Sequence, residues 1–277
     1  MGTGGPPVTV RAATLAGGEN NQDRYAHGDG WAFVLDGASS FATEQPEHDG
    51  GWYAERLKNA LVHELTAHPD DATADIVARA IGVAASAHAD PETCPTSTIA
   101  LARWSAQTVE TYVLGDSPAV LITADGTEEV LTDSRISAIA PDVRAEYRSR
   151  LTDGHGFDNR HRRLLQELQA RQAASRNRPE GYWIAGAEPL AAYYGLRDIR
   201  PVQTLRCVAL ASDGAAAGQR YGSFPTWSAF ASSSLRETLL DVRSAESADR
   251  DAFQWPRSKA QDDKTVIMIW FTNGAPG

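Results

Sequence analysis

Short runs of apolar residues alternate with polar segments along the chain, and their spacing predicts where strands and helices form. Near the N-terminus, VTVRAATLAG and WAFVLDG have the composition of two strands, separated by the loop GENNQDRYAHGDG. The apolar residues of WYAERLKNALVHEL and ATADIVARAIGVAASAHA recur at helical spacing. We therefore expect two amphipathic helices between residues 52 and 89.

Four brief β-rich runs follow these helices, namely STIALARW, VETYVLGD, AVLITAD and EEVLT. Turns separate them, which is typical of an antiparallel meander rather than of βαβ units. A polar insertion at about residues 142–180 comes next, with an apolar face only around RRLLQELQA. The runs LRCVALASDG and KTVIMIWF predict two more strands, with helical TWSAFASSSLRETLLDV between them. The pattern predicts an α+β fold in which helices flank central antiparallel strands.

Composition narrows the class of protein. Of the 277 residues, 42% are hydrophobic and 22% charged, so the chain can bury a sizeable core. The net charge of −10 favours a divalent cation as partner and disfavours nucleic acid or an anionic membrane. With no long apolar window and no signal-peptide pattern, we expect a cytoplasmic protein. Cys94 and Cys207 lack the spacing of disulfide or zinc sites and are interpreted as ordinary thiols.

Aspartates stand at the ends of apolar strands in four separate parts of the chain. They are Asp36, Asp116, Asp213 and the neighbours Asp262 and Asp263. Each one alone is as readily a turn residue as a ligand. Strand ends can converge at one edge of a sheet sandwich, where loops build a site. Because carboxylates suit Mg²⁺ and Mn²⁺ better than zinc, the four together predict a divalent-cation site.

Six short motifs occur in an order that resembles the metal-dependent protein phosphatases, the PPM or type 2C family. They are NQDRY, VLDGAS, PTSTIALA, YVLGDSPAVL, ALASDG and DDKTVIMI. The resemblance implies one αββα domain over residues 8–272, after a flexible segment of residues 1–7. It also implies a bacterial-type enzyme that hydrolyses phosphoserine and phosphothreonine in proteins, the products of a Ser/Thr kinase.

The resemblance further implies a site for two Mn²⁺ or Mg²⁺ ions, whose bound water performs the catalysis. Asp36 matches the acid that bridges both ions, and the carbonyl of Gly37 matches a ligand of one of them. Asp213 and Asp262 match the acids that hold the other ion. Asp263 ranks below Asp262, because many relatives have asparagine at its position.

Two further acids match supporting positions of the family. Asp23 matches the acid that supports the metal-bound water, beside Gln22, where many relatives carry glutamate. Asp116 matches the acid that bacterial relatives use, together with Asp213, for a weaker third ion.

The chain departs from the family at two positions. Gly18 stands where a phosphate-binding arginine usually lies, and Ala38 stands where eukaryotic relatives carry a histidine general acid. Two alternatives therefore stay open: a pseudophosphatase that serves as a binding or regulatory module, and a phosphatase of a small phosphorylated metabolite. The intact Asp36, Asp213 and Asp262 argue against the first alternative.

Residues 144–178 contain nine arginines, at the place where bacterial relatives have a flap beside the active site. One hypothesis is a solvated helix whose arginines pair with neighbouring acids, namely Glu146, Asp158 and Glu167. The other is a phosphate clamp that replaces the missing arginine, with Arg160 and Arg163 as its candidates.

Other conspicuous residues are interpreted as structural. TDGHGF, residues 152–157, looks like the eukaryotic Asp-Gly-His motif, but no apolar strand precedes it, so we expect a glycine turn. Trp31 and Trp270 are expected in the core. Four histidines without ligand spacing are expected at the surface, namely His63, His68, His88 and His161.

Overall fold

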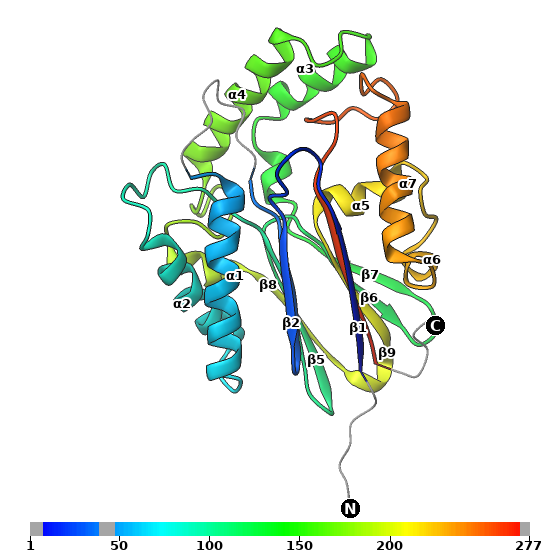
Figure 1. The fold of residues 1–277 in the computed structure, drawn as a ribbon. Helices are drawn as coiled ribbons and strands as arrows, with labels where there is room; N and C mark the ends of the chain where they lie inside the picture. The colour runs from blue at the N-terminus through cyan, green and yellow to red at the C-terminus, as the bar shows by residue number, and fades with distance from the viewer. Residues whose placement is uncertain (1–7, 39–47, 272–277) are drawn as a thin grey trace, which may run out of the picture.

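The computed structural model describes residues 8–38 and 48–271, so the predicted flexible segment 1–7 lies outside the described residues. Two five-stranded antiparallel sheets pack face to face, with helices on both outer surfaces (Figure 1). This arrangement confirms the predicted α+β sandwich. No helix within the described residues combines the length and apolar character of a membrane span.

The first sheet has the strand order β1-β10-β9-β6-β7. Its strands are β1 (Thr9–Leu15), β10 (Lys264–Trp270), β9 (Leu205–Ala211), β6 (Ala119–Thr123) and β7 (Glu128–Leu131). The second sheet has the order β2-β3-β4-β5-β8. Its strands are β2 (Arg24–Gly28), β3 (Trp31–Leu35), β4 (Ile99–Trp104), β5 (Thr108–Leu114) and β8 (Leu196–Pro201).

Seven α-helices lie in the described residues. They are α1 (Gly50–Ala67), α2 (Thr73–Ala85), α3 (Pro141–Thr152), α4 (Asn159–Ser175), α5 (Asp213–Arg220), α6 (Trp227–Ala231) and α7 (Leu235–Ala248). Short 3₁₀ turns are η1 (Arg135–Ala138), η2 (Pro189–Tyr194) and η3 (Val202–Thr204). The pair α1 and α2 covers the second sheet, and α5 to α7 cover the first (Figure 1).

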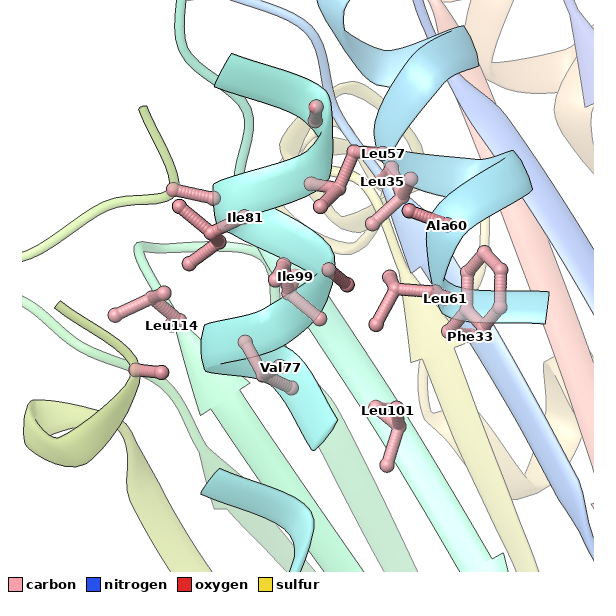
Figure 2. Close-up of a cluster of buried hydrophobic side chains, with 14 of the residues drawn as sticks. Phe33, Leu35, Leu57, Ala60, Leu61, Val77, Ile81, Ile99, Leu101 and Leu114 are labelled. Carbon is pink, nitrogen blue, oxygen red and sulfur yellow. The ribbon is translucent and has the colours of Figure 1, made fainter. Parts of the chain in front are cut away.

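The central strands are buried on both faces, which explains their continuous apolar sequences. In β3, Phe33 and Leu35 face α1 and α2, while Ala32 and Val34 face the opposite sheet. Figure 2 shows the outer cluster, where Leu35 lies beside Leu57 of α1 and Phe33 lies beside Leu61, while Ile81 of α2 belongs to the same cluster. The expected core positions of the two tryptophans are confirmed, with Trp31 and Trp270 8% and 2% exposed. The sheets therefore form a rigid support for the loops at their ends.

The prediction of one meander was wrong. The hairpin β4–β5 belongs to the second sheet and the hairpin β6–β7 to the first, so the chain changes sheets between Leu114 and Ala119. Period-two alternation identifies a strand but not the sheet that it joins, because both sheets bury the same kinds of side chain. The edge strands β2 and β8 were also missed, since their residues are polar and half exposed.

The polar insertion forms the helical hairpin α3–α4 above the ends of both sheets (Figure 1). A narrow apolar stripe holds it together, made by Val143, Tyr147 and Leu151 against Leu164, Leu165 and Leu168. Its exposed acids pair with arginines, at 2.6 Å in each of the pairs Arg150–Asp158, Arg160–Glu146 and Arg171–Glu167. The solvated-helix hypothesis is confirmed for these three pairs.

Candidate active site

One cavity of about 400 Å³ lies beneath the α3–α4 hairpin, at the ends of strands from both sheets. Four of the predicted acids line it: Asp36 after β3, Asp116 after β5, Asp213 after β9 and Asp262 before β10. They are 226 residues apart in sequence from first to last, and the fold brings them together. The helix α5 begins at Asp213, so its carboxylate lies at the positive end of a helix dipole.

Asp36 and Asp213 both line this cavity and are close enough for the charge of Asp213 to act on Asp36. Burial raises the pKa of Asp36 well above its usual range, and the charges of Asp213, Asp23 and Asp262 raise it further. Burial also raises the pKa of Asp213, with the charge of Asp262 as the next cause. Two carboxylates in contact repel each other, so this pair shares a proton or accepts a cation.

Asp23 lies just before β2 and is only 4% exposed. Both of its carboxylate oxygens are buried without a hydrogen-bond partner. Burial raises its pKa to about 7, and the nearby hydroxyls of Ser212 and Thr265 offset only part of that effect. A buried acid without a partner is costly, which points to a ligand or water at this position.

Asp116 lines the cavity, and Gly37 directly follows Asp36 in the chain. Burial raises the pKa of Asp116 to about 7, Asp213 adds to the shift and Arg144 opposes it. Gly37 is buried, and a Cβ there would lie 2.5 Å from the carbonyl oxygen of Gly50. Only glycine lets the chain after Asp36 pass so close to the start of α1.

Asp263 has a structural role that separates it from Asp262. Its carboxylate accepts hydrogen bonds from the backbone nitrogens of Gly17 and Gln22, at 2.5 and 2.8 Å. These bonds tie the β1–β2 loop to the start of β10. The amide of Gln22 donates to Asp49, the N-cap of α1, at 3.1 Å. Both residues support the loops around the cavity.

A lysine that sequence reasoning missed stands among the cavity acids. The ammonium group of Lys259 lies 2.5 Å from Oδ1 of Asp262. Burial works against this charge, but the carboxylates of Asp262, Asp213 and Asp36 outweigh burial and raise the pKa of Lys259. Lys259 follows no strand and matches no motif, so the sequence carries no signal for it.

A second ion pair, which is fully buried, contacts the backbone of Asp262. Lys264 donates to Glu246 at 2.6 Å and to the carbonyl of Asp262 at 2.7 Å. Glu246 comes from α7, so the pair connects this helix to the start of β10. Lys264 lies within the motif DDKTVIMI, directly after Asp263.

The candidate phosphate clamp needs correction. Arg160 is exposed and paired with Glu146, and neither Arg160 nor Arg163 lines the cavity. Arg144 and Arg148 of α3 line it instead. Arg144 donates to the carbonyls of Ile139 and Ile136 at 3.0 and 2.9 Å, and no acid pairs with it among the residues that the structure describes. The packing of the α3–α4 hairpin decides which arginines face the cavity, and the amino-acid composition of the hairpin does not reveal that packing.

The two departures from the family pattern have different surroundings. Nothing lies within 4 Å of the point where a Cβ of Gly18 would stand, so packing does not explain this glycine. Ala38 lines the cavity, close to Asp36 in sequence. The cavity wall therefore carries a methyl group where eukaryotic relatives carry an imidazole.

The residues interpreted as structural mostly behave as expected. Asp153 is exposed at the end of α3, and Gly154 and Gly156 have φ values of +82° and +58°, which confirms the glycine turn. The surface expectation for His161 was wrong. Its ring is 3% exposed, packs edge-on against Tyr147 and Phe157, and hydrogen-bonds the carbonyl of Ser258 at 3.1 Å.

The donor set fits hard divalent cations. Within residues 8–38 and 48–271, no three carboxylate, imidazole or thiol groups are already arranged as a ligand set. Three carboxyl groups with raised pKa values nevertheless line the cavity, and the buried Asp23, whose oxygens have no hydrogen-bond partner, is close enough to Asp36 to raise the pKa of that acid. This negative potential and the oxygen donors suit Mg²⁺ or Mn²⁺, with reorientation of side chains on binding.

Comparisons with known proteins agree with this geometry. The protein-family profile described as protein phosphatase 2C matches residues 12–251. The catalytic domain of the serine/threonine protein phosphatase PstP, solved with two manganese ions, is similar with a TM-score of 0.53 and 15% identity, over 95% of this chain and 97% of that chain. No curated protein sequence matches the chain.

Two further solved structures share the fold. The PPM Ser-Thr phosphatase MsPP from Mycobacterium smegmatis, in complex with cacodylate, gives a TM-score of 0.51 at 19% identity, over 94% of this chain and 97% of that chain. The serine/threonine phosphatase Stp1 from Staphylococcus aureus gives 0.52 at 13% identity, over 96% of both chains. At these identities the likeness concerns the fold alone. Because the family profile spans most of the chain and the fold agrees with it, the chain belongs to the protein phosphatase 2C family of phosphoester hydrolases.

Proposed function

We propose that residues 8–272 form one metal-dependent phosphatase domain, which removes phosphate from phosphoserine and phosphothreonine in proteins. One observation carries the proposal: acids from four strand ends line a single cavity, and burial together with mutual repulsion raises the pKa values of three of them, Asp36, Asp116 and Asp213. A Ser/Thr kinase would produce such substrates. A cytoplasmic location stays a prediction from the sequence.

In this proposal the cavity acids hold the cations. Asp36 and the carbonyl of Gly37 would hold one ion, and Asp36, Asp213 and Asp262 the second. Asp116 would hold a weaker third ion with help from Asp213. Two Mn²⁺ or Mg²⁺ ions would supply an activated water and neutralise phosphate oxygens during in-line displacement. The manganese ions in the PstP structure support the choice of metal.

The remaining side chains orient water and substrate. The partnerless oxygens of Asp23 would accept hydrogen bonds from water in the site. Ala38 cannot donate a proton, so the leaving seryl or threonyl oxygen would take its proton from water. Catalysis then depends on the position and charge of the acids, and no side chain serves as nucleophile.

We propose that Arg144, rather than Arg160 or Arg163, binds the phosphate group of the substrate. Its guanidinium is held by two carbonyl groups, lines the cavity and is close enough to Asp116 to lower that acid's pKa. A guanidinium fixed in this way loses little entropy when it binds a phosphate with two parallel hydrogen bonds. Arg144 would thus provide the phosphate contact that Gly18, which has no side chain, cannot provide.

Two other functions use the same cavity. The pseudophosphatase alternative is favoured by Gly18 and by the ammonium group of Lys259 among the acids. The metabolite alternative is favoured by the cavity beneath the α3–α4 hairpin, because its volume of about 400 Å³ is large enough for a small phosphorylated molecule.

Phosphate release distinguishes these functions. Nitrophenyl phosphate should be hydrolysed with Mn²⁺, not after chelation, and again when Mn²⁺ is restored. Hydrolysis that is unaffected by chelation would reject the metal mechanism, and no hydrolysis in excess Mn²⁺ would favour the pseudophosphatase. Phosphopeptides should then be better substrates than a panel of sugar and nucleotide phosphates. The opposite order would favour the metabolite enzyme.

A further inference from the structure

Among the described residues, Lys259 is the one basic side chain that forms an ion pair with Asp36, Asp116, Asp213 or Asp262, the acids proposed as metal ligands. Its ammonium group and Oδ1 of Asp262 are 2.5 Å apart, with 28% and 23% of the two side chains exposed. The same ammonium is near enough to Asp213 and Asp36 to interact with their charges. A single lysine thus faces three of the proposed metal ligands.

The loop around Lys259 is anchored on both sides. The buried Arg257 donates to the carbonyls of Glu246 and Ala260, at 3.0 and 3.1 Å, and pairs with Asp249 at 2.9 Å. His161 of α4 donates to the carbonyl of Ser258 at 3.1 Å. Because Arg257 and Ser258 before Lys259 are bonded to α7 and α4, and Ala260 after it is bonded to Arg257, the fold limits where this side chain can point.

The charges of the cavity do not balance. Three carboxyl groups, those of Asp36, Asp213 and Asp262, face one ammonium group, which can neutralise one negative charge at most. A divalent cation would still be attracted. However, the Asp262 oxygen that it needs already binds the ammonium, and one carboxylate oxygen cannot make its closest contact with both cations.

We propose that Lys259 is a tethered counter-ion that competes with a divalent cation for Asp262 and so weakens metal binding by this chain. In the metal-free chain it holds the acids together. When a cation binds, the ammonium leaves Asp262 and stays in the cavity. The inference rests on the proposed metal site, and it adds that the chain carries its own competitor for that site.

The chain contains a matched control pair outside the cavity. Lys58 and Glu55 are three residues apart, like Lys259 and Asp262, and their charged groups are also 2.5 Å apart. The Lys58 side chain is 26% exposed, close to the value for Lys259. Lys58→Met therefore removes the same charge from a similar ion pair without touching the cavity acids.

The test measures Mn²⁺ affinity by calorimetry on the full, chelator-stripped chain at one salt concentration. Lys259→Met should bind Mn²⁺ at least about tenfold more tightly than wild type, because the competing charge is gone. Lys259→Arg should remain near wild type, and Lys58→Met should differ from it by less than about twofold. Weaker or equal binding by Lys259→Met would overturn the proposal.

Thermal unfolding in chelator gives a second readout that needs no metal. Lys259→Met should lower the melting temperature in the wild-type background and lower it less in the Asp262→Asn background, because the pair is already broken there. Equal losses in both backgrounds would overturn the ion-pair role. If neither wild type nor Lys259→Met bound Mn²⁺, the proposed metal site itself would be rejected. Equal, measurable affinities in the two proteins would reject the competition by Lys259 and leave the metal site standing.

Discussion

Lys264 and Glu246 form an ion pair of 2.6 Å in which the two side chains are 0% and 1% exposed. Burial lowers the pKa of Lys264 and raises that of Glu246, so each charge depends on the other. Since Lys264 also donates to the carbonyl of Asp262, the pair connects the core to the cavity.

Breaking this pair should be strongly destabilising. Lys264→Met leaves the charge of Glu246 buried without its partner, and we expect a loss of about 3–5 kcal/mol in the free energy of unfolding. Adding Glu246→Leu should recover much of the loss, because no buried charge then remains. Urea unfolding in chelator measures both variants. A double mutant no more stable than the single one would contradict the buried-charge explanation.

Asp36→Asn should abolish turnover while the metal-free protein remains at least as stable as wild type. Removing one of the crowded charges relieves repulsion with Asp213, Asp23 and Asp262. Mn²⁺ should then raise the melting temperature of wild type more than that of the variant. Equal shifts in the two proteins would show that Asp36 is not a ligand.

The metal-free chain should lose stability as the pH rises from about 5 to 7. Asp23 and Asp116 have pKa values of about 7 in the folded chain, against 3.8 as the ordinary value. Within that window the folded chain therefore holds protons that the unfolded chain has lost, and stability falls, by on the order of 2 kcal/mol for each of the two acids.

Urea unfolding at several pH values tests this dependence. Acids with a lowered pKa titrate below the window and do not interfere; examples are Glu55, which is bonded to Lys58 and Arg24, and Asp158, which accepts a hydrogen bond from the backbone of His161 and pairs with Arg150. Asp23→Asn should reduce the slope, and excess Mn²⁺ should reverse it because metal binding favours ionised carboxylates. Rising stability in chelator over this range would refute the assignment.

Arg144→Ala should raise the Michaelis constant for a phosphopeptide by about tenfold or more, since a bidentate phosphate contact is lost. Arg160→Ala should change it by less than about twofold, because Arg160 is exposed and paired with Glu146. Mn²⁺ affinity and melting temperature serve as controls for both variants. Equal effects of the two substitutions would remove Arg144 from the substrate site.

Thiol alkylation should leave the rate nearly unchanged. Both cysteines are free and buried, and neither lines the cavity. Burial raises the pKa of Cys94, and it raises that of Cys207 to about 11, so little thiolate forms at neutral pH. Inactivation by iodoacetamide at pH 7.5, with the fold intact by circular dichroism, would speak against a metal-only mechanism.

Much of the scaffold could be predicted from local sequence. The strands β3, β9 and β10 are mainly apolar, and α1 and α2 have apolar residues at helical spacing. Buried positions in these elements can therefore be recognised from the sequence. The cavity acids were found for a similar reason. A carboxylate directly after an apolar strand is conspicuous wherever it occurs, and Asp36, Asp116 and Asp213 all share that pattern.

Other features depend on contacts between distant segments, which leave no local trace. The pairing of β5 with β8 and of β6 with β9 separates two hairpins that look alike in sequence.

The α3–α4 hairpin is mostly polar, and the packing of its narrow stripe turns Arg144 toward the cavity and leaves Arg160 in solvent. Lys259 meets Asp262 because Arg257 and His161 anchor its loop from two different helices. A charged side chain is tolerated in any solvent-exposed loop, so the neighbouring sequence does not reveal which charged group it will contact in the fold. That choice is made when the loop is packed against the rest of the molecule.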